Sequence, residues 1–343
     1  MDDGKRATIN DVARLANVSK KTVSRVINRS PFVRPETRDR VDAVIAELGY
    51  RPDPQARALA FRRSFLIGLI YDNPNPQYVI DMQQGILDVL RGSGFELLVH
   101  PCRRDAPHFL EEIRGFVERQ RLAGVVLPPS VSEDDAVIAL LNELDCPYVR
   151  IASVLLDDPD VSIVTHDADG AMEAARHLAE LGHTRIAHIS GPPGFRSAHE
   201  RRGGFASGLS AMGLKLDPHL DIEAAYTFES GVVAGARLLA MKRRPTAVFC
   251  GNDEMAAGVC QAARDAKLDI GADISVIGFD DSPLAARLWP PLTSVLLPVR
   301  MLGRIAAARV IGEAAPMEPP AEHLVREVRP RLVVRASTGP PRA

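Results

Sequence analysis

The chain has 343 residues, of which 46% are hydrophobic and 25% are charged. This is ordinary globular usage, so the composition excludes collagen-like, disordered and disulfide-scaffold proteins and leaves room for about two domains of roughly 150 residues. No apolar run approaches the roughly 18 residues of a membrane span, and the N-terminus lacks the apolar region of a signal peptide, so we expect a cytoplasmic protein with no membrane partner.

Charge is distributed unevenly along the chain. Residues 1–63 contain 14 Lys and Arg against 8 Asp and Glu, whereas the remainder contains 28 against 36. A small basic module followed by a larger acidic body is the pattern of a nucleic-acid reader attached to another domain. Charge alone does not decide the matter, because a basic face is often merely solvated.

The first fifty residues predict three short helices. Thr8 begins a helix-start pattern, and the apolar spacing of one helical face continues for about eight residues. Ser19 can cap a second helix over residues 20–27. A third helix is expected between Pro35, which suits a first helical position, and Gly49, which suits a stop. The first two helices, joined by a tight turn, form a helix-turn-helix.

The second helix has two distinct faces. Its inward face carries Val23, Val26 and Ile27, and its outward face carries Lys20, Lys21, Thr22, Ser24 and Arg25. The outward donors suit phosphate oxygens and the O6 and N7 atoms of guanine in a major groove. A generic three-helix bundle with a solvated basic face fits the periodicity equally well.

Two stretches of the sequence favour DNA binding over a generic three-helix bundle. ATINDVARLANVSKKTVSRVIN and VRPETRDRVDAVIAELGYRPDPQARALA resemble the N-terminal signature of the LacI/GalR family of bacterial transcription regulators. The resemblance implies that double-stranded operator DNA is a partner. Base reading falls to Lys20, Lys21 and Arg25, while Thr22, Ser24 and Asn28 fix the DNA backbone.

The resemblance is not complete. Asn17, Arg34 and Asp53 stand where the family usually has Gly, Ser and Asn. Arg34 removes a helix cap and is expected to contact a phosphate instead. The capping hydroxyls Thr8 and Ser19 are also expected to meet phosphates.

Residues 51–64 are the expected linker, because Pro52 and Pro54 prevent the third helix from continuing. A short helix can follow, too short to be stable alone in water. The resemblance implies a hinge helix that folds when two subunits meet on DNA, with Leu59 wedged into the minor groove and Ala56 beside it. The alternative is a small interdomain helix with Leu59 packed on the body.

From Phe65 onward, strand-like and helical runs alternate. Strands are expected at 65–71, 95–101, 123–129, 146–152, 185–190, 246–251 and 274–280, with helices at 82–90, 109–119, 136–144, 171–181, 200–212 and 255–266. This order predicts an α/β core of two doubly wound parallel sheets, which bind ligands where the carboxyl ends of the strands face a cleft.

The expected domains are therefore a headpiece, a linker and a two-lobed core. Their bounds are 1–50, 51–64 and 65–343, with lobe one at about 65–164 plus 293–325 and lobe two at 165–292 plus the C-terminal strand. A final strand followed by a loose tail is expected from Pro330 onward. That segment contains no leucine heptads, so we expect a homodimer rather than a tetramer.

The body also resembles the LacI/GalR core, which shares the periplasmic sugar-binding architecture. HLAELGHTRIAHISGPPG, RRGGFASGL, AVFCGNDEMAAGV and ISVIGFDDSP carry this resemblance, together with WPPLTSV. By matching position, Arg201, Asn252 and Asp280 hold a small-molecule effector, expected to be a mono- or disaccharide. Tyr78 and Tyr226 are the expected aromatic partners, with packing at the cleft edge as their alternative.

Further candidates follow from position alone. Asp72, Asn75 and Gln77 lie in a polar turn after the first strand, and Arg150 lies at the end of another. Each is a plausible partner for a hydroxyl group. Helix capping is the competing explanation for the turn residues.

No catalytic, cofactor or metal site is predicted. Ser-His-Asp, P-loop and dinucleotide patterns are missing, and His177, His183 and His188 lack a carboxylate partner for zinc. The four cysteines, Cys102, Cys146, Cys250 and Cys260, have no metal-ligand spacing and indicate reduced thiols.

The predicted function is a sequence-specific DNA-binding repressor of carbohydrate-utilisation genes, released from a pseudo-palindromic operator by a sugar. The alternatives are a regulator with a corepressor such as a purine, and a sugar sensor that does not act on DNA.

Overall fold

The computed structural model of the chain describes residues 7–27, 32–50, 64–156, 158–314 and 325–342. The chain divides into two compact units, residues 1–65 and 66–343. Among the described helices, none is long and apolar enough to cross a membrane.

The N-terminal unit contains the three predicted helices: α1 (Ile9–Leu15), α2 (Lys20–Ile27) and α3 (Pro35–Leu48). The backbone N–H of Thr8 donates to Asp11 at 2.9 Å, which closes the predicted start of α1. Asn17 makes the turn with φ of 50°, a conformation that Asn tolerates better than most residues. Gly49 ends α3 with φ of 56°. The sequence prediction for this unit is confirmed.

The three helices share one small apolar core. Its buried members are Val12, Ala13, Ala16, Val23, Val26, Val33 and Val41. Because Val23 and Val26 point into this core, the opposite face of α2 is left to the solvent.

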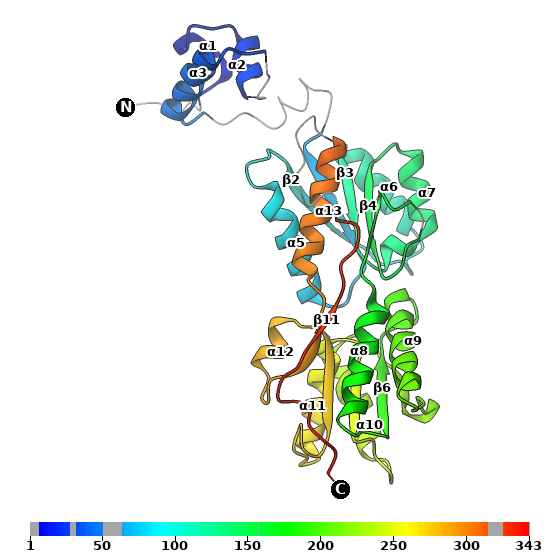
Figure 1. Cartoon of the computed structure of the whole chain (residues 1–343). Coiled ribbons are helices and arrows are strands. Elements are labelled where there is room, and N and C mark those ends of the chain that lie inside the picture. The colour runs from blue at the N-terminus through cyan, green and yellow to red at the C-terminus, as the bar shows by residue number, and fades with distance from the viewer. Residues whose placement is uncertain (1–6, 28–31, 51–63, 157, 315–324, 343) are drawn as a thin grey trace. The chain divides into compact units, whose positions relative to one another are not determined.

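The first lobe of the larger unit is built on a five-stranded sheet in the order β2-β1-β3-β4-β5, with all strand pairs parallel. The strands are β1 (Leu66–Tyr71), β2 (Glu96–Pro101), β3 (Gly124–Leu127), β4 (Tyr148–Ala152) and β5 (Ser162–Val164). Helices α5 (Pro76–Leu90) and α13 (Val299–Ala314) cover one face, while α6 (Phe109–Gln120) and α7 (Asp135–Glu143) cover the other (Figure 1). A short 3₁₀ helix, η1 (Val131–Glu133), precedes α7.

Helices α5 and α13 lie unusually close together. A Cβ atom at Gly85 would stand 2.0 Å from the carbonyl oxygen of Arg300, and one at Gly303 would stand 2.4 Å from that of Met82. Glycine at both positions lets the two backbones touch, so a helix from late in the chain is fixed to the first lobe.

The second lobe is built on a six-stranded sheet in the order β11-β10-β9-β8-β6-β7. Its strands are β6 (Ile186–Ser190), β7 (Asp221–Glu223), β8 (Ala247–Cys250), β9 (Ser275–Asp280), β10 (Thr293–Leu296) and β11 (Arg331–Val333). Only the β10–β11 pair is antiparallel in this sheet.

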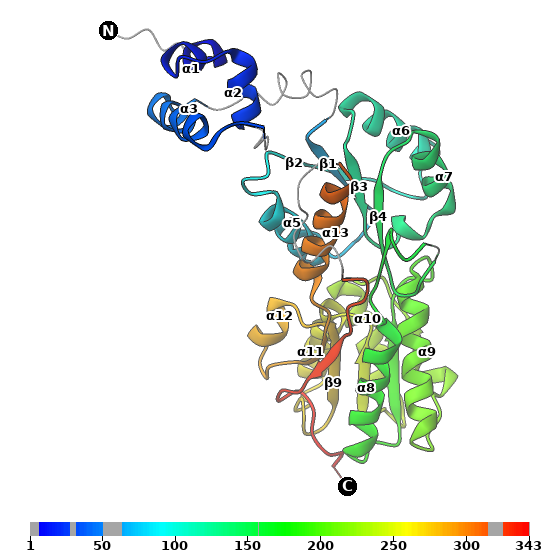
Figure 2. The same ribbon diagram turned by 45° about the horizontal axis from the view of Figure 1, so that its top comes forward.

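The helices of the second lobe pack in pairs on its two faces (Figure 2). They are α8 (Asp167–Glu180) with α9 (Arg196–Ala211), and α10 (Phe228–Leu239) with α11 (Asp253–Asp265). A short helix, α12 (Pro283–Arg287), packs beside α11, and the 3₁₀ helix η2 (Pro218–Leu220) precedes β7. The doubly wound parallel architecture that the sequence predicts is confirmed.

The boundary between the lobes differs from the expectation. Residues 293–296 pair in parallel with β9 and belong to the second lobe, although they were assigned to the first. The chain therefore crosses back at Leu297 and Pro298, directly before α13. The reason is that residues 293–296, with the sequence TSVL, form a further strand of the second-lobe sheet before Pro298 interrupts the strand.

The C-terminal tail is not loose as expected. The carbonyl oxygen of Ser337 accepts from the backbone N–H of Val276 at 2.9 Å, and its hydroxyl accepts from that of Thr293 at 2.8 Å. Ser337 is fully buried. The tail seals the end of the second sheet by satisfying backbone groups that β9 and β10 leave open.

Several elements were absent from the sequence prediction. Strands β5 and β7 have three residues each, too few to show an alternating pattern. Helices α10, α12 and α13 were also not predicted. In α10, Gly231 and Gly235 lower helix propensity, but they allow contact with α11: a Cβ at Gly231 would lie 2.3 Å from the carbonyl oxygen of Met255.

Candidate functional site

The outward face of α2 is basic. Lys20, Lys21 and Arg25 are exposed, while Thr22 and Ser24 are half-buried. The Ser19 hydroxyl oxygen accepts from the backbone N–H of Thr22 at 3.1 Å, so this residue caps α2. This surface has the donors and charge that a DNA groove requires.

The other DNA-contact candidates differ in their surroundings. Thr8 is exposed, and its hydroxyl donates to Asp11 at 2.6 Å. Arg34 is exposed at the start of α3 and makes no side-chain cap there, as its replacement of Ser predicts. Asn28, Ala56 and Leu59 lie outside the described residues.

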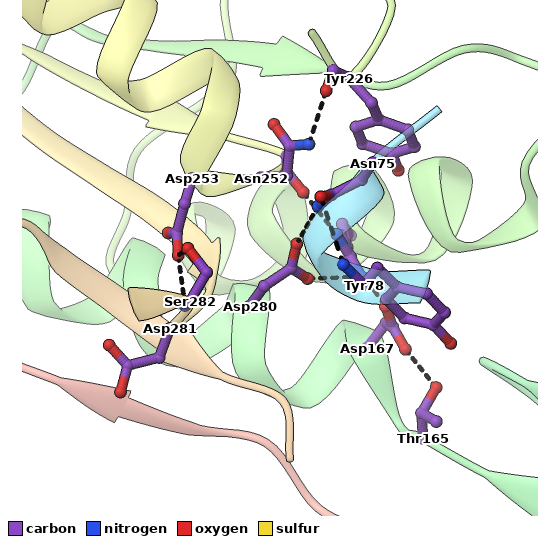
Figure 3. Close-up of polar contacts among 12 residues, drawn as sticks. Asn75, Tyr78, Thr165, Asp167, Tyr226, Asn252, Asp253, Asp280, Asp281 and Ser282 are labelled. Atoms are coloured by element: carbon purple, nitrogen blue, oxygen red, sulfur yellow. Dashed lines mark hydrogen bonds and ion pairs between the residues drawn. The ribbon is translucent and has the colours of Figure 1, made fainter. Parts of the chain in front are cut away.

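A pocket lies where the two lobes of the larger unit face each other (Figure 3). Its lining comprises Asn73, Asn75, Tyr78, Pro129, Thr165, Asp167, Phe195, Ser197, Arg201, Tyr226, Asn252, Asp280 and Leu297. Most of these residues follow the carboxyl ends of strands, where ligand sites of doubly wound sheets are found. The free volume is about 40 Å³, which admits only a few water molecules, so a larger ligand requires the lobes to separate.

Arg201 of α9 is the buried cation of this pocket. Its Nε donates to Asp167 Oδ2 at 2.7 Å, and its Nη1 donates to the carbonyl oxygen of Gly251. The guanidinium also lies 3.7 Å from the centre of the Phe279 ring. Burial is the largest single influence on the pKa of Arg201 and lowers it, but the charges of Asp167 and its other acidic neighbours together outweigh burial, so the pKa stays above its ordinary value and Arg201 is charged.

Asp280 ends β9 with φ of 105°, a conformation that costs a non-glycine residue free energy and often marks a functional site. Its Oδ2 accepts from Asn75 Nδ2 at 3.2 Å across the cleft. Its Oδ1 is buried without a hydrogen bond and stands 3.8 Å from Arg201 Nη2. Burial raises the pKa of Asp280 to about 8. A hydroxyl-bearing ligand would supply the donor that Oδ1 lacks.

Aromatic side chains form the apolar part of the lining. The rings of Phe195 and Tyr226 meet edge to face, with centres 5.5 Å apart. A Cβ at Gly191 would lie 2.0 Å from the Tyr226 ring, so glycine is what lets that ring reach the pocket. Tyr78 is buried on the first-lobe side. Flat apolar surfaces beside hydrogen-bonding groups suit the two faces of a sugar ring.

The predicted effector residues are mostly brought together. Asn75, Tyr78, Arg201, Tyr226, Asn252 and Asp280 all line the pocket. Two of them also cap helices, as the competing explanation held: Asn75 Oδ1 accepts from the backbone N–H of Gln77, and Asn252 Oδ1 from that of Met255. Because α5 begins at Pro76 rather than at the expected residue 82, Gln77 and Tyr78 belong to its first turn.

Two predicted residues lie elsewhere. The carboxylate of Asp72 accepts from the backbone N–H of Arg104 at 3.2 Å and does not line the pocket. Arg150 is buried inside the first lobe, where its Nε donates to the carbonyl oxygen of Ser132 at 2.6 Å. Position at a strand end was a poor guide here, because the long arginine side chain turns back to satisfy a loop carbonyl.

Several lining residues were missed, chiefly Thr165, Asp167, Phe195 and Ser197. Thr165 and Asp167 follow β5, whose three residues gave no strand signal. The Thr165 hydroxyl donates to Asp167 and fixes the carboxylate that Arg201 contacts. A polar Thr-His-Asp run directly before a helical segment was the available clue.

The residues that the structure describes hold no group of three metal-ligating side chains. His183 contacts Thr246 and Ser275. His188 contacts the carboxylate of Asp221 at 2.8 Å, so the expectation that it lacks a carboxylate partner is wrong. Burial lowers the pKa of both histidines. The four cysteines are buried and free. These histidines and cysteines therefore pack the interior rather than line the pocket.

Comparison with known proteins matches both units. The family model for bacterial regulatory proteins of the lacI family matches residues 8–53, and the model for a periplasmic binding protein-like domain matches residues 175–338. The ribose operon repressor of Haemophilus influenzae is 33% identical over 305 residues, covering 89% of this chain and 91% of that protein.

Two solved structures are similar over almost the whole chain. A complex of the transcriptional regulator CelR with cellobiose has a TM-score of 0.69 and 31% identity, with 97% of this chain and 100% of that chain covered. The lac repressor dimer bound to operator and the anti-inducer ONPF has a TM-score of 0.77 and 28% identity, with 98% and 100% covered.

Proposed function

The chain belongs to the LacI family of bacterial regulatory proteins, and from that premise we propose that it is a DNA-binding repressor that a carbohydrate releases from its operator. The observation that carries the carbohydrate assignment is the pocket itself. A buried arginine, a carboxylate with an open oxygen and the rings of Phe195 and Tyr226 line the second-lobe side of the pocket, opposite Asn75 and Tyr78 of the first lobe. Similarity to the CelR complex with cellobiose supports the same assignment.

The DNA-reading residues are part of the proposal. Lys20, Lys21 and Arg25 would contact base edges and phosphates from α2, with Thr22 and Ser24 beside them. Asn28, Arg34, Ala56 and Leu59 are assigned to operator contacts from the resemblance alone. A repressor of this kind acts in the cytoplasm, where bacterial DNA lies.

A homodimer is the proposed assembly. The lac repressor structure that this chain resembles is a dimer on its operator. A dimer places two headpieces on two half-sites, so the operator should be pseudo-palindromic. Selection from a random duplex library with the full-length protein tests this, because a monomeric reader would instead enrich single half-sites.

The effector is tested with a thermal-unfolding screen. A ligand at 100 times its Kd adds about 2.7 kcal/mol to stability. The panel contains neutral monosaccharides and disaccharides, sugar phosphates and purines. Stabilisation by a neutral sugar supports the proposal. Stabilisation by a purine alone would contradict the carbohydrate assignment and favour the alternative of a regulator with a purine corepressor.

A further inference from the structure

A second cavity opens beside the pocket and extends the binding cleft. It has about 210 Å³ of free volume and shares Asn75, Tyr78, Asp280 and Leu297 with the pocket. The crossover at Leu297 and Pro298 and the start of α13 form its floor. We call the pocket the inner chamber and this second cavity the outer chamber.

The outer chamber is acidic. Asp81 of α5, Asp280 and Asp281 line it, and its one arginine among the lining residues is Arg300. Arg300 is already neutralised outside the chamber, because its Nε and Nη2 donate to Asp88 at 2.7 and 3.0 Å. Asp281 is paired with Arg335 at 2.6 Å, whereas Asp81 accepts a hydrogen bond from the uncharged Gln77 at 2.9 Å and feels Arg300 only at longer range.

The inner chamber supplies no compensating positive charge. Its cation, Arg201, is paired with Asp167. In the described lining of both chambers, each arginine therefore already has a carboxylate partner. An anionic ligand would meet the carboxylate of Asp81 and find, among these lining residues, no arginine that lacks a carboxylate partner.

Acceptor oxygens occur in both chambers and at the junction between them. Asp280 stands at their junction, with the unpaired Oδ1 described above. Asp81 and Ser282 follow on the outer side. Hydroxyl groups are donors, so a second sugar unit in the outer chamber would satisfy these acceptors.

We propose that the outer chamber is a second subsite that selects a neutral effector of two sugar units, with Asp81 as its specificity-determining residue. This rests on the proposed function, in which the first unit occupies the inner chamber. The subsite rejects uronic acids and sugar phosphates, because their charge would be buried beside the carboxylate of Asp81.

The test measures Kd by calorimetry for full-length protein with matched ligand sets. Each set contains a neutral hexose, disaccharides of that hexose, its uronic acid and its 6-phosphate. For the hexose that binds, we expect a disaccharide to bind at least about tenfold more tightly than the monosaccharide, and the two anions to bind at least about tenfold more weakly.

The variant Asp81→Asn separates the subsite from the pocket. It should lose about tenfold in affinity for the disaccharide and leave the affinity for the monosaccharide within about twofold. Asp265→Asn is the matched control: Asp265 is exposed on α11 and accepts from Gln261 one helical turn away at 2.8 Å, as Asp81 does from Gln77. This control should change neither affinity.

The outcomes are distinguishable. Equal affinity for monosaccharide and disaccharide, or an Asp81→Asn variant that binds the disaccharide as tightly as the unchanged protein, would overturn the subsite and leave the proposed function in place. Tight binding of a uronic acid or sugar phosphate would overturn the charge selection. Binding of no neutral sugar at all would overturn both.

Discussion

Arg201 shows how one side chain links the stability of the second lobe to its ligand site. Its guanidinium is 8% exposed, and its partner Asp167 is 2% exposed. Both charges are therefore held away from water and depend on each other. Removing one leaves the other buried without compensation, which costs more than the pair itself contributes.

The variant Arg201→Ala should lose about 3–5 kcal/mol of unfolding free energy, because it leaves the buried Asp167 without its cation. Urea unfolding gives the value. The double variant Arg201→Ala with Asp167→Ala should recover part of the loss. If the loss of unfolding free energy in the double variant equals the sum of the losses in the two single variants, the two residues are not coupled in this way.

Asp280 makes stability depend on pH in an unusual direction. Burial raises its pKa to about 8 from 3.8, with nearby carboxylates adding to the shift and Arg201 opposing it. The folded state therefore keeps a proton that the unfolded chain releases above about pH 4. The contribution of Asp280 to stability is greatest below that pH and is lost as the pH rises towards 8.

Asp280→Asn should remove this dependence. Between pH 5 and 8, the unfolding free energy of the unchanged protein should fall relative to that of the variant, by at most about 1.4 kcal/mol per pH unit. Asp253, whose pKa burial raises to about 7, titrates in both proteins, so its effect cancels in the difference. A difference that stays constant across this range would show that Asp280 is already ionised.

At the scale of elements, α2 is the part of the headpiece that carries charge outward. Lys21→Ala should weaken binding to all duplexes alike and reduce the salt dependence of log K by about one unit of slope, because one phosphate contact is lost. Fluorescence anisotropy over a range of salt concentrations measures both. Lys242→Ala is the control, since Lys242 is an exposed lysine of the larger unit.

A salt slope that is unchanged in Lys21→Ala would place the DNA contact on another face. Arg25→Ala differs in its expected effect. If Arg25 reads a guanine, its loss should relax sequence preference at one base pair by about 1–3 kcal/mol rather than weaken all duplexes equally.

Two hydrogen bonds join the lobes at the mouth of the pocket. Arg104 of the first lobe donates to the carbonyl oxygen of Gly194 in the second at 2.6 Å, and Glu133 of η1 accepts from the backbone N–H of Arg196 at 3.1 Å. Phe195 and Ser197, the chain neighbours of Gly194 and Arg196, line the pocket. These contacts must break before the lobes can separate to admit a ligand.

Arg104→Ala should therefore raise both the association and dissociation rates of the sugar identified in the screen, several-fold each, because opening becomes easier. Stopped-flow fluorescence measures both rates. Arg103→Ala is the neighbouring control, since Arg103 forms a local ion pair with Asp105 at 2.9 Å within the first lobe. Rates that change equally in both variants would mean that the contact with Gly194 does not restrain the cleft.

The sequence predicted elements best where local chemistry decides them. Caps such as Thr8, Ser19 and Gly49 act within one turn, so the headpiece helices could be placed closely. The sequence could not predict to which lobe residues 293–296 belong, nor that the tail packs around Ser337, because both depend on strand pairing between distant segments. Arg201 and Asp280 followed from a family resemblance, but Asp167 required the fold that brings the start of α8 beside α9.

In the whole molecule, the proposed function joins a DNA-binding unit to a sugar-binding unit in one chain. The two functions must be coupled through free energy, since each ligand can influence the other only by favouring a different state of the protein. A coupling of about 1–3 kcal/mol corresponds to a change of about 5- to 150-fold in operator affinity. The inner chamber is too small for a sugar in this structure, so binding must change the lobes.

The central claim is that a neutral sugar in the cleft weakens operator binding. The direct measurement is the Kd of the full-length protein for its selected operator duplex, by fluorescence anisotropy at fixed salt, with and without a saturating neutral disaccharide from the screen. We expect the operator Kd to be about 5- to 150-fold higher with the sugar than without it. An operator Kd that is unchanged or lower when the sugar is demonstrably bound would contradict it.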